Sequence, residues 1–168
     1  MITIFKREFK SYFTSVIGYV FFALFMLFYG LFFYMAIMGG ETSGLISSGM
    51  SSFFSMIYLV LTLLIPVLTM RLFSEERKQK TDQILLTSPV NLSQIVLGKF
   101  FSAFAIYSIA VGSTIFVALI IAAFGTLNFV EYIGMLVGLL FIGASLIAVG
   151  TFISSLTESQ VVAAFATF

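Results

Sequence analysis

The sequence predicts an all-α protein that crosses a membrane several times. Of its 168 residues, 61% are hydrophobic and only 9% are charged, whereas a typical soluble domain has about 25% charged residues. The few charges are bunched, and long charge-free stretches separate the bunches. A chain of this size could not cover so much apolar surface with polar side chains in water. We therefore exclude a soluble domain and a disordered chain, and expect a polytopic bundle of transmembrane helices.

The charge-free stretches are long enough to be transmembrane helices, which need about 20 mostly apolar residues. They are apolar on every side, and this disfavours barrel strands, in which polar and apolar residues alternate. We expect four full spans and the start of a fifth. These lie near residues 16–38, 51–70, 100–124, 132–154 and 158–168.

The N-terminal residues 2–13 have the pattern of an amphipathic helix. Phe5 and Phe9 fall on one side and Lys6 and Lys10 on another, at helical spacing. Such a helix lies in the membrane interface with its apolar face toward the lipid. Two alternatives are a simple basic flank and the start of a secretory signal peptide. A signal peptide fits poorly, because the following apolar stretch is too long and lacks a small-residue cleavage site.

The C-terminal residues predict a helix that begins but does not cross a membrane. Thr157 and Gln160 have the spacing of a capping box, with Thr157 as the N-cap. Residues 158–168 would then rise only about 15 Å, half the thickness of a bilayer core. We expect from this that the chain is truncated within a fifth span.

The basic residues predict the orientation of the chain. All eight Lys and Arg lie in residues 6–10 and 71–99. Because cytoplasmic segments carry the excess of Lys and Arg, the N-terminus and the 71–99 loop are expected on the cytoplasmic side. Only Glu41 and Glu131 then lie outside.

The 71–99 loop is far longer than a tight connection between two helices requires. Ser74 can cap a short helix over residues 74–87, and Pro89 stops it. This helix carries charges of both signs and one apolar patch, a mixture that suits a protein surface better than an anionic lipid surface. The alternative is a solvated helix held by its own side-chain pairs.

Two further patterns concern helix shape and packing. Pro66 lies inside the second span and should kink it. The kink would either only set the shape of the helix or carry movement of the loop into the membrane. Gly134 and Gly138 form a GxxxG pattern in the fourth span, and Gly143 and Gly150 add small positions. Such positions permit close helix packing.

Several kinds of chemistry are missing from the sequence. With no Cys and no His, disulfides, thiol chemistry and zinc sites built from these residues are excluded. No charge lies in the middle of an expected span, which disfavours ion-coupled transporters and membrane hydrolases. The sequence has no phosphate-binding GxxxxGK[ST] loop and no excess of basic charge for nucleic acid. Energy for any transport must come from another chain.

Three segments of the loop and its flanks form a distinctive pattern: IPVLTMRLFSEERK at 65–78, TDQILLTSPV at 81–90 and IVLGKF at 95–100. They resemble the type 2 ABC transporter permeases, in particular the gliding-motility-associated and multidrug-type subgroup. Residues 6–13 and 154–160 are also similar to that subgroup. The departures are Lys80, where the family most often has Gly, and Asp82-Gln83, which replace Leu-Glu.

The resemblance implies a single permease domain over residues 1–168, in a family whose members have six spans. The 71–99 loop would hold a coupling helix that docks on a separate ABC ATP-binding subunit. A second permease copy or homologue would complete the transporter in the cytoplasmic (plasma or inner) membrane. ATP and magnesium would bind the partner ATPase, and no cofactor is expected on this chain.

On the same basis, the expected function is that of a permease subunit of an ATP-driven exporter, which is not itself an enzyme. Two alternatives stay open: a membrane scaffold that recruits a soluble partner through its cytoplasmic helix, and a fragment of a secondary transporter or membrane enzyme. The resemblance assigns charged coupling contacts and an apolar footing to the loop. The charged contacts would be made by Glu75, Glu76, Arg77 and Lys78, and the apolar contacts by Ile84, Leu85 and Leu86.

Overall fold

The structure is a computed structural model that describes residues 2–38, 49–74, 92–124, 129–157 and 159–168. These residues form helices and contain no strand. The helices are α1 (Ile2–Thr14), α2 (Val16–Met38), α3 (Gly49–Thr69), α6 (Leu92–Phe124), α7 (Phe129–Leu156) and α8 (Gln160–Thr167).

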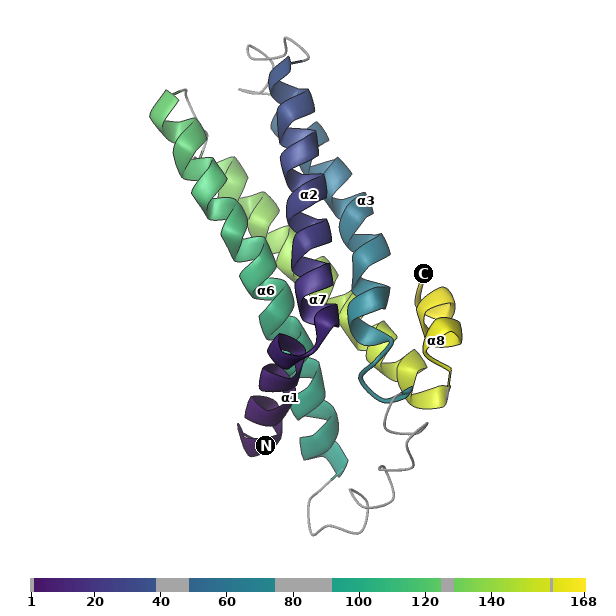
Figure 1. The fold of residues 1–168 in the computed structure, drawn as a ribbon. Coiled ribbons are helices and arrows are strands. Elements are labelled where there is room, and N and C mark those ends of the chain that lie inside the picture. The colour runs from purple at the N-terminus through teal and green to yellow at the C-terminus, as the bar shows by residue number, and fades with distance from the viewer. Residues whose placement is uncertain (1, 39–48, 75–91, 125–128, 158) are drawn as a thin grey trace.

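Four long helices, α2, α3, α6 and α7, form an elongated bundle, with the two short helices beside one end of it (Figure 1). At that end α3 finishes, α6 begins and α7 finishes, and we name it the junction end. Here α1 packs on α6, and α8 packs on α7 and α3. The opposite end, where α6 finishes and α7 begins, is named the distal end.

Each long helix buries one stripe of its apolar surface. In α2 the buried residues Phe21, Phe25 and Tyr29 recur every four positions, which is the spacing of one helix face. The other faces stay apolar and exposed: Phe116 and Phe141 are each 74% exposed. Soluble monomers rarely expose so much contiguous apolar surface. This pattern fits a bundle whose outer surface faces lipid.

Among the described residues, three helices are long and apolar enough to cross a membrane. Their spanning stretches are Gly18–Met35, Ser93–Phe116 and Phe129–Leu156. The second expected span corresponds to α3, in which the described apolar stretch Ser55–Thr69 is shorter. The structure thus supports an all-helical membrane fold, with three candidate spans among its described residues.

The third expected span, residues 100–124, is part of a longer helix. Helix α6 begins at Leu92 and has 33 residues. At 1.5 Å per residue this helix is about 50 Å long, which exceeds a hydrocarbon core of about 30 Å. Its first turns, including Lys99, therefore extend the bundle at the junction end.

The expected capping box at Thr157 is wrong. The N-cap of α8 is Ser159, whose side chain makes no capping hydrogen bond. The Thr157 hydroxyl instead donates to the carbonyl of Ile153 at 3.3 Å. Because α7 continues to Leu156, Thr157 directly follows the preceding helix and bonds back to its last turn.

Candidate functional site at the end of alpha3

The loop residues assigned to coupling lie outside the described residues. This holds for Glu75, Glu76, Arg77, Lys78, Ile84, Leu85 and Leu86, and for nearly all of the expected helix 74–87. The structure does describe the segment that leads directly into them. We name residues 68–74 the exit segment, since the chain leaves α3 there.

The exit segment begins as helix and continues as turns. The amide of Met70 donates to the carbonyl of Pro66 at 2.8 Å, and the amide of Leu72 donates to Thr69 at 3.1 Å. Pro66 itself is buried, and α3 continues through it to Thr69. The kink expected at Pro66 stays a prediction.

Ser154, near the end of α7, binds the exit segment through three hydrogen bonds. Its Oγ accepts from the amides of Phe73 at 3.1 Å and Ser74 at 3.3 Å, and donates to the carbonyl of Met70 at 3.3 Å. A hydroxyl has one donor and two acceptor sites, so all three are used. The Ser74 hydroxyl also donates to the Met70 carbonyl.

Lys99 of α6 binds the exit segment from another direction. Its side chain is only 2% exposed, and its Nζ donates to the carbonyl of Leu72. The same Nζ lies 3.8 Å from the Glu8 carboxylate of α1 and 4.9 Å from the centre of the Phe73 ring. A buried ammonium group is costly unless it is paired and hydrogen-bonded. The exit segment and α1 together supply these partners.

Helix α1 also contacts the exit segment directly. The buried Tyr12 hydroxyl donates to the carbonyl of Leu68 at 3.2 Å. Helix α1 is therefore connected to the exit segment twice: through Tyr12, and through Glu8 and Lys99. The two links lie four residues apart, on the side of α1 that faces the bundle.

Two glycines of α7 allow its close approach to neighbouring helices. A Cβ on Gly150 would lie 2.3 Å from Oγ1 of Thr69, and one on Gly143 would lie 2.2 Å from the ring of Tyr107. By contrast, a Cβ on Gly134 or Gly138 would meet no described atom within 4 Å. The packing role expected for this GxxxG pair is therefore not exercised inside the described chain. A contact with another chain stays a prediction.

Sequence reasoning did not single out the residues that hold the exit segment. Lys99 was expected only to mark the membrane edge, and Ser154 was noted only as part of the 154–160 segment. Tyr12 and Glu8 carried no signal beyond their place in an amphipathic helix. Their importance depends on which residues of other helices they meet, and a pattern within one helix does not contain this information.

The arrangement connects the exit segment to three other helices. Among the described residues, no group of acidic, Cys or His side chains could hold a metal ion. The polar groups instead connect three helices to the backbone of one short segment. A displacement of that segment must move α1, α6 and α7 with it, or break hydrogen bonds in surroundings where their loss is costly.

One comparison with known proteins identifies the family. A sequence model described as "ABC-2 family transporter protein" matches residues 2–168. No curated protein and no solved structure gives a significant match. Because the family match covers nearly the entire chain, this protein belongs to the ABC-2 transporter family. It is a transmembrane protein of the permease type.

Proposed function

We propose that this ABC-2 family membrane protein is the permease subunit of an ATP-driven exporter, and that its exit segment carries movement from the coupling loop into the bundle. The observation that supports this most directly is the convergence on residues 68–74. Five backbone positions there bind side chains of three other helices. The next residue along the chain, Glu75, is the first of the expected coupling contacts.

The proposed topology has four spans: α2, α3, α6 and α7. Helix α3 counts as a span because its 21 residues rise about 32 Å, enough to cross a hydrocarbon core of about 30 Å. The described basic residues lie on α1, in the exit segment and at the start of α6, all at the junction end. By the excess of positive charge on the inner side, the junction end faces the cytoplasm.

In this mechanism the ATP-binding subunit is a separate protein that contacts the 75–86 region. The partner makes charged contacts with Glu75, Glu76, Arg77 and Lys78. It makes apolar contacts with residues 84–86. ATP and magnesium bind that partner, since this sequence has no phosphate-binding loop. When the partner moves the loop, the exit segment moves as one body with the helices bound to it. A second permease copy or homologue completes the transport path.

Charge reversal in the coupling loop tests the proposal. The triple variant Glu75→Lys, Glu76→Lys, Arg77→Glu should abolish co-purification with the ATP-binding subunit and the stimulation of its ATPase activity. The matched control is Glu131→Lys at the distal end, which changes net charge by the same amount and should leave both intact. An intact complex with normal stimulation in the triple variant would overturn the coupling assignment.

The same preparation separates an exporter from a scaffold. In reconstituted vesicles, an exporter couples ATP hydrolysis to movement of substrate, and the triple variant loses both together. A scaffold binds its partner through the same loop, but transport is absent already in the unaltered protein. The scaffold would be favoured if the unaltered protein binds the ATP-binding subunit but shows no ATP-dependent transport of any substrate that stimulates the ATPase.

A further inference from the structure

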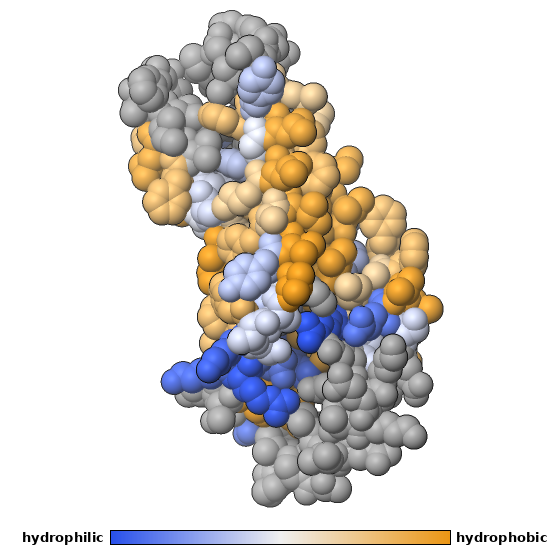
Figure 2. Space-filling view, viewed as in Figure 1, coloured by the Kyte–Doolittle hydropathy of each residue, from blue (hydrophilic) through white to orange (hydrophobic). Residues whose placement is uncertain are grey.

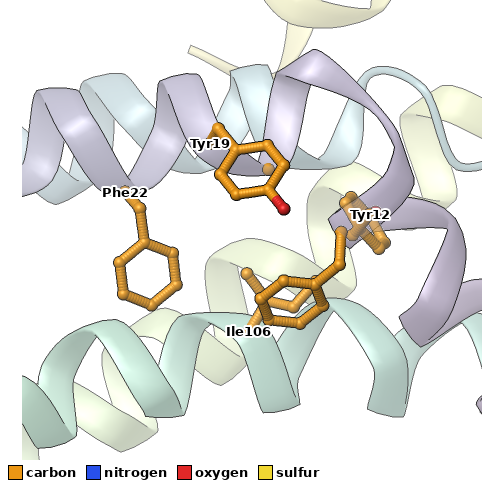
Figure 3. A pocket seen from close by; sticks show the side chains of 6 residues that line it. Tyr12, Tyr19, Phe22 and Ile106 are labelled. Carbon is orange, nitrogen blue, oxygen red and sulfur yellow. The ribbon is translucent and has the colours of Figure 1, made fainter.

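An apolar pocket lies at the elbow where α1 joins α2, and α6 forms its opposite wall (Figure 3). Its volume is about 280 Å³. Tyr19 and Phe22 reach from α2 toward Ile106 of α6, and Tyr12 closes the α1 side (Figure 3). Phe13 and Gly18 complete the lining. The pocket opens to the outside of the bundle, because Phe13 is 41% and Tyr19 is 61% exposed.

The elbow that shapes the pocket is held in place by local contacts. A Cβ on Gly18 would lie 2.4 Å from the carbonyl oxygen of Tyr12, so only glycine allows the first turn of α2 to approach α1 this closely. The Ser15 amide donates to Ser11 at 3.0 Å, and the Ser15 hydroxyl donates to Tyr12 at 3.3 Å. The pocket is therefore largely preformed, as ligand pockets usually are.

A basic face adjoins the open side of the pocket. Lys10 and Lys6 precede Phe13 by three and seven residues, so these three side chains share one face of α1. Both lysines are exposed, and Lys6 lies about 10 Å from Phe13 along the helix axis. The one acidic residue of this helix, Glu8, points inward to Lys99 at 3.8 Å and pairs with Arg7 at 3.7 Å.

The pocket lies at the boundary between two kinds of surface. Figure 2 shows hydrophilic residues gathered around α1, and an apolar surface that begins beside them over the long helices. In a membrane protein such a boundary corresponds to the level of the lipid headgroups, where Tyr side chains are enriched. Tyr12 and Tyr19 line the pocket at this level.

We propose that the elbow pocket binds one acyl chain of an anionic phospholipid, whose phosphate group lies between Lys6 and Lys10. The volume lies near the lower bound of ligand pockets, roughly 300–1,000 Å³, so it suits part of a single acyl chain rather than a whole lipid. The apolar lining fits the chain, and the adjoining lysines complement the headgroup. This inference does not depend on the proposed transport function.

A tryptophan reporter can detect the lipid, because the chain contains no Trp. The F13W variant places the reporter in the pocket lining, and F152W places it on α7, where Phe152 is 64% exposed. Each full-length variant is reconstituted in phosphatidylcholine vesicles with either brominated phosphatidylglycerol or brominated phosphatidylcholine at the same mole fraction. Brominated phosphatidylglycerol should quench F13W more strongly, and the two lipids should quench F152W equally.

Charge variants distinguish a site from diffuse attraction to the membrane. In the F13W background, Lys10→Gln and Lys6→Gln should each lower the apparent affinity for phosphatidylglycerol roughly fivefold. Arg7→Gln removes the same charge from an exposed residue about 120° away from Phe13 around the helix. It should have a clearly smaller effect. Equal losses for Arg7→Gln and Lys10→Gln would overturn the site.

The apolar half of the site is tested separately. Tyr19→Ala removes one wall of the pocket, whereas Tyr34→Ala removes an equally exposed tyrosine near the other end of α2. Only the first should reduce the phosphatidylglycerol preference of F13W. If brominated phosphatidylcholine quenches F13W as strongly as phosphatidylglycerol does, the pocket does not select an anionic lipid, and the proposal fails.

Discussion

The two ends of the bundle are held together in different ways. At the junction end, Lys99, Ser154 and Tyr12 bind the backbone of the exit segment through buried polar contacts. At the distal end, among the described contacts, Thr114 Oγ1 of α6 and the Tyr132 hydroxyl of α7 lie 3.1 Å apart. Beside it is an apolar hollow of about 310 Å³, lined by Ile115, Ala118, Leu119, Phe129, Tyr132, Ile133 and Leu136.

The difference teaches how one bundle can be stiff at one end and adaptable at the other. Buried hydrogen bonds specify one geometry, because each donor and acceptor loses its partner when the geometry changes. Apolar contacts tolerate repacking when the volume is kept. The junction end is therefore suited to move as one body when the exit segment is displaced. The distal end is suited to repack. The following four predictions test this contrast.

Removal of the buried ammonium group should have the largest effect. Lys99→Met keeps an unbranched side chain but leaves Glu8 and the Leu72 carbonyl without this partner. Breaking a buried ion pair costs about 3–5 kcal/mol, and the midpoint of thermal unfolding in nanodiscs should fall accordingly. Lys10→Met on the exposed face of α1 should change stability by less than about 0.5 kcal/mol. Similar effects of the two variants would show that burial of Lys99 has no energetic consequence.

Added volume on α7 should distinguish its glycines. Gly150→Ala and Gly143→Ala force a methyl group against Thr69 and Tyr107, and overpacking typically costs about 1–3 kcal/mol. The Tyr107 ring cannot easily move aside, because its hydroxyl donates to Leu139 at 2.6 Å. The loss of stability can be measured by thermal unfolding.

The GxxxG pair supplies the control for these variants. Gly134→Ala and Gly138→Ala should be neutral or stabilise by up to about 1 kcal/mol, since Ala is the better helix former. If they instead weaken self-association, measured by crosslinking in the membrane, the pair packs against a second chain. Destabilisation by all four substitutions alike would contradict the distinction drawn from the structure.

Loss of one hydroxyl should weaken the junction end. Ser154→Ala leaves the amides of Phe73 and Ser74 without their acceptor, at a cost of about 1–2 kcal/mol. It should also reduce stimulation of the partner ATPase. Ser155→Ala removes a neighbouring hydroxyl that bonds only within its own helix, at 2.6 Å to Phe152 among the described contacts, and should have little effect. Equal behaviour of the two variants would remove Ser154 from the mechanism.

Two tyrosine variants separate mechanics from stability. Tyr12→Phe and Tyr132→Phe each remove a hydroxyl with a buried hydrogen bond among the described contacts, and each should cost about 0.5–1.5 kcal/mol. Only Tyr12→Phe should lower ATPase stimulation at a temperature where both proteins remain folded. A loss of stimulation in Tyr132→Phe of the same size would show that the two ends contribute equally to coupling.

Much of the helical framework could be predicted from hydropathy and charge. The first span was expected at residues 16–38, the bounds that α2 has. The N-terminal helix ends at Thr14 rather than residue 13, and α7 extends the expected 132–154 by a few residues at each end. These features depend on long uniform runs of residues, which local sequence displays directly.

Local sequence says less where helices meet. The third span was expected at residues 100–124, with Lys99 at the membrane edge, because a charge normally marks that edge. In the structure α6 continues through Lys99, whose charge is covered by Glu8, the Leu72 carbonyl and Phe73. Likewise, the sequence pointed to four small positions in the fourth span, and among the described residues the close approaches occur at Gly143 and Gly150. Spacing within a helix does not say which face meets a neighbour.

By itself the sequence determined that the protein is helical, that most of its surface faces lipid, and that most of its charges gather at one end. These properties are sums over many residues, so no single contact decides them. Only the tertiary structure decided that Lys99, Ser154 and Tyr12 hold the exit segment. The reason is physical: a buried polar group is stable only beside its partner, and here the partners lie 27 to 84 residues away along the chain.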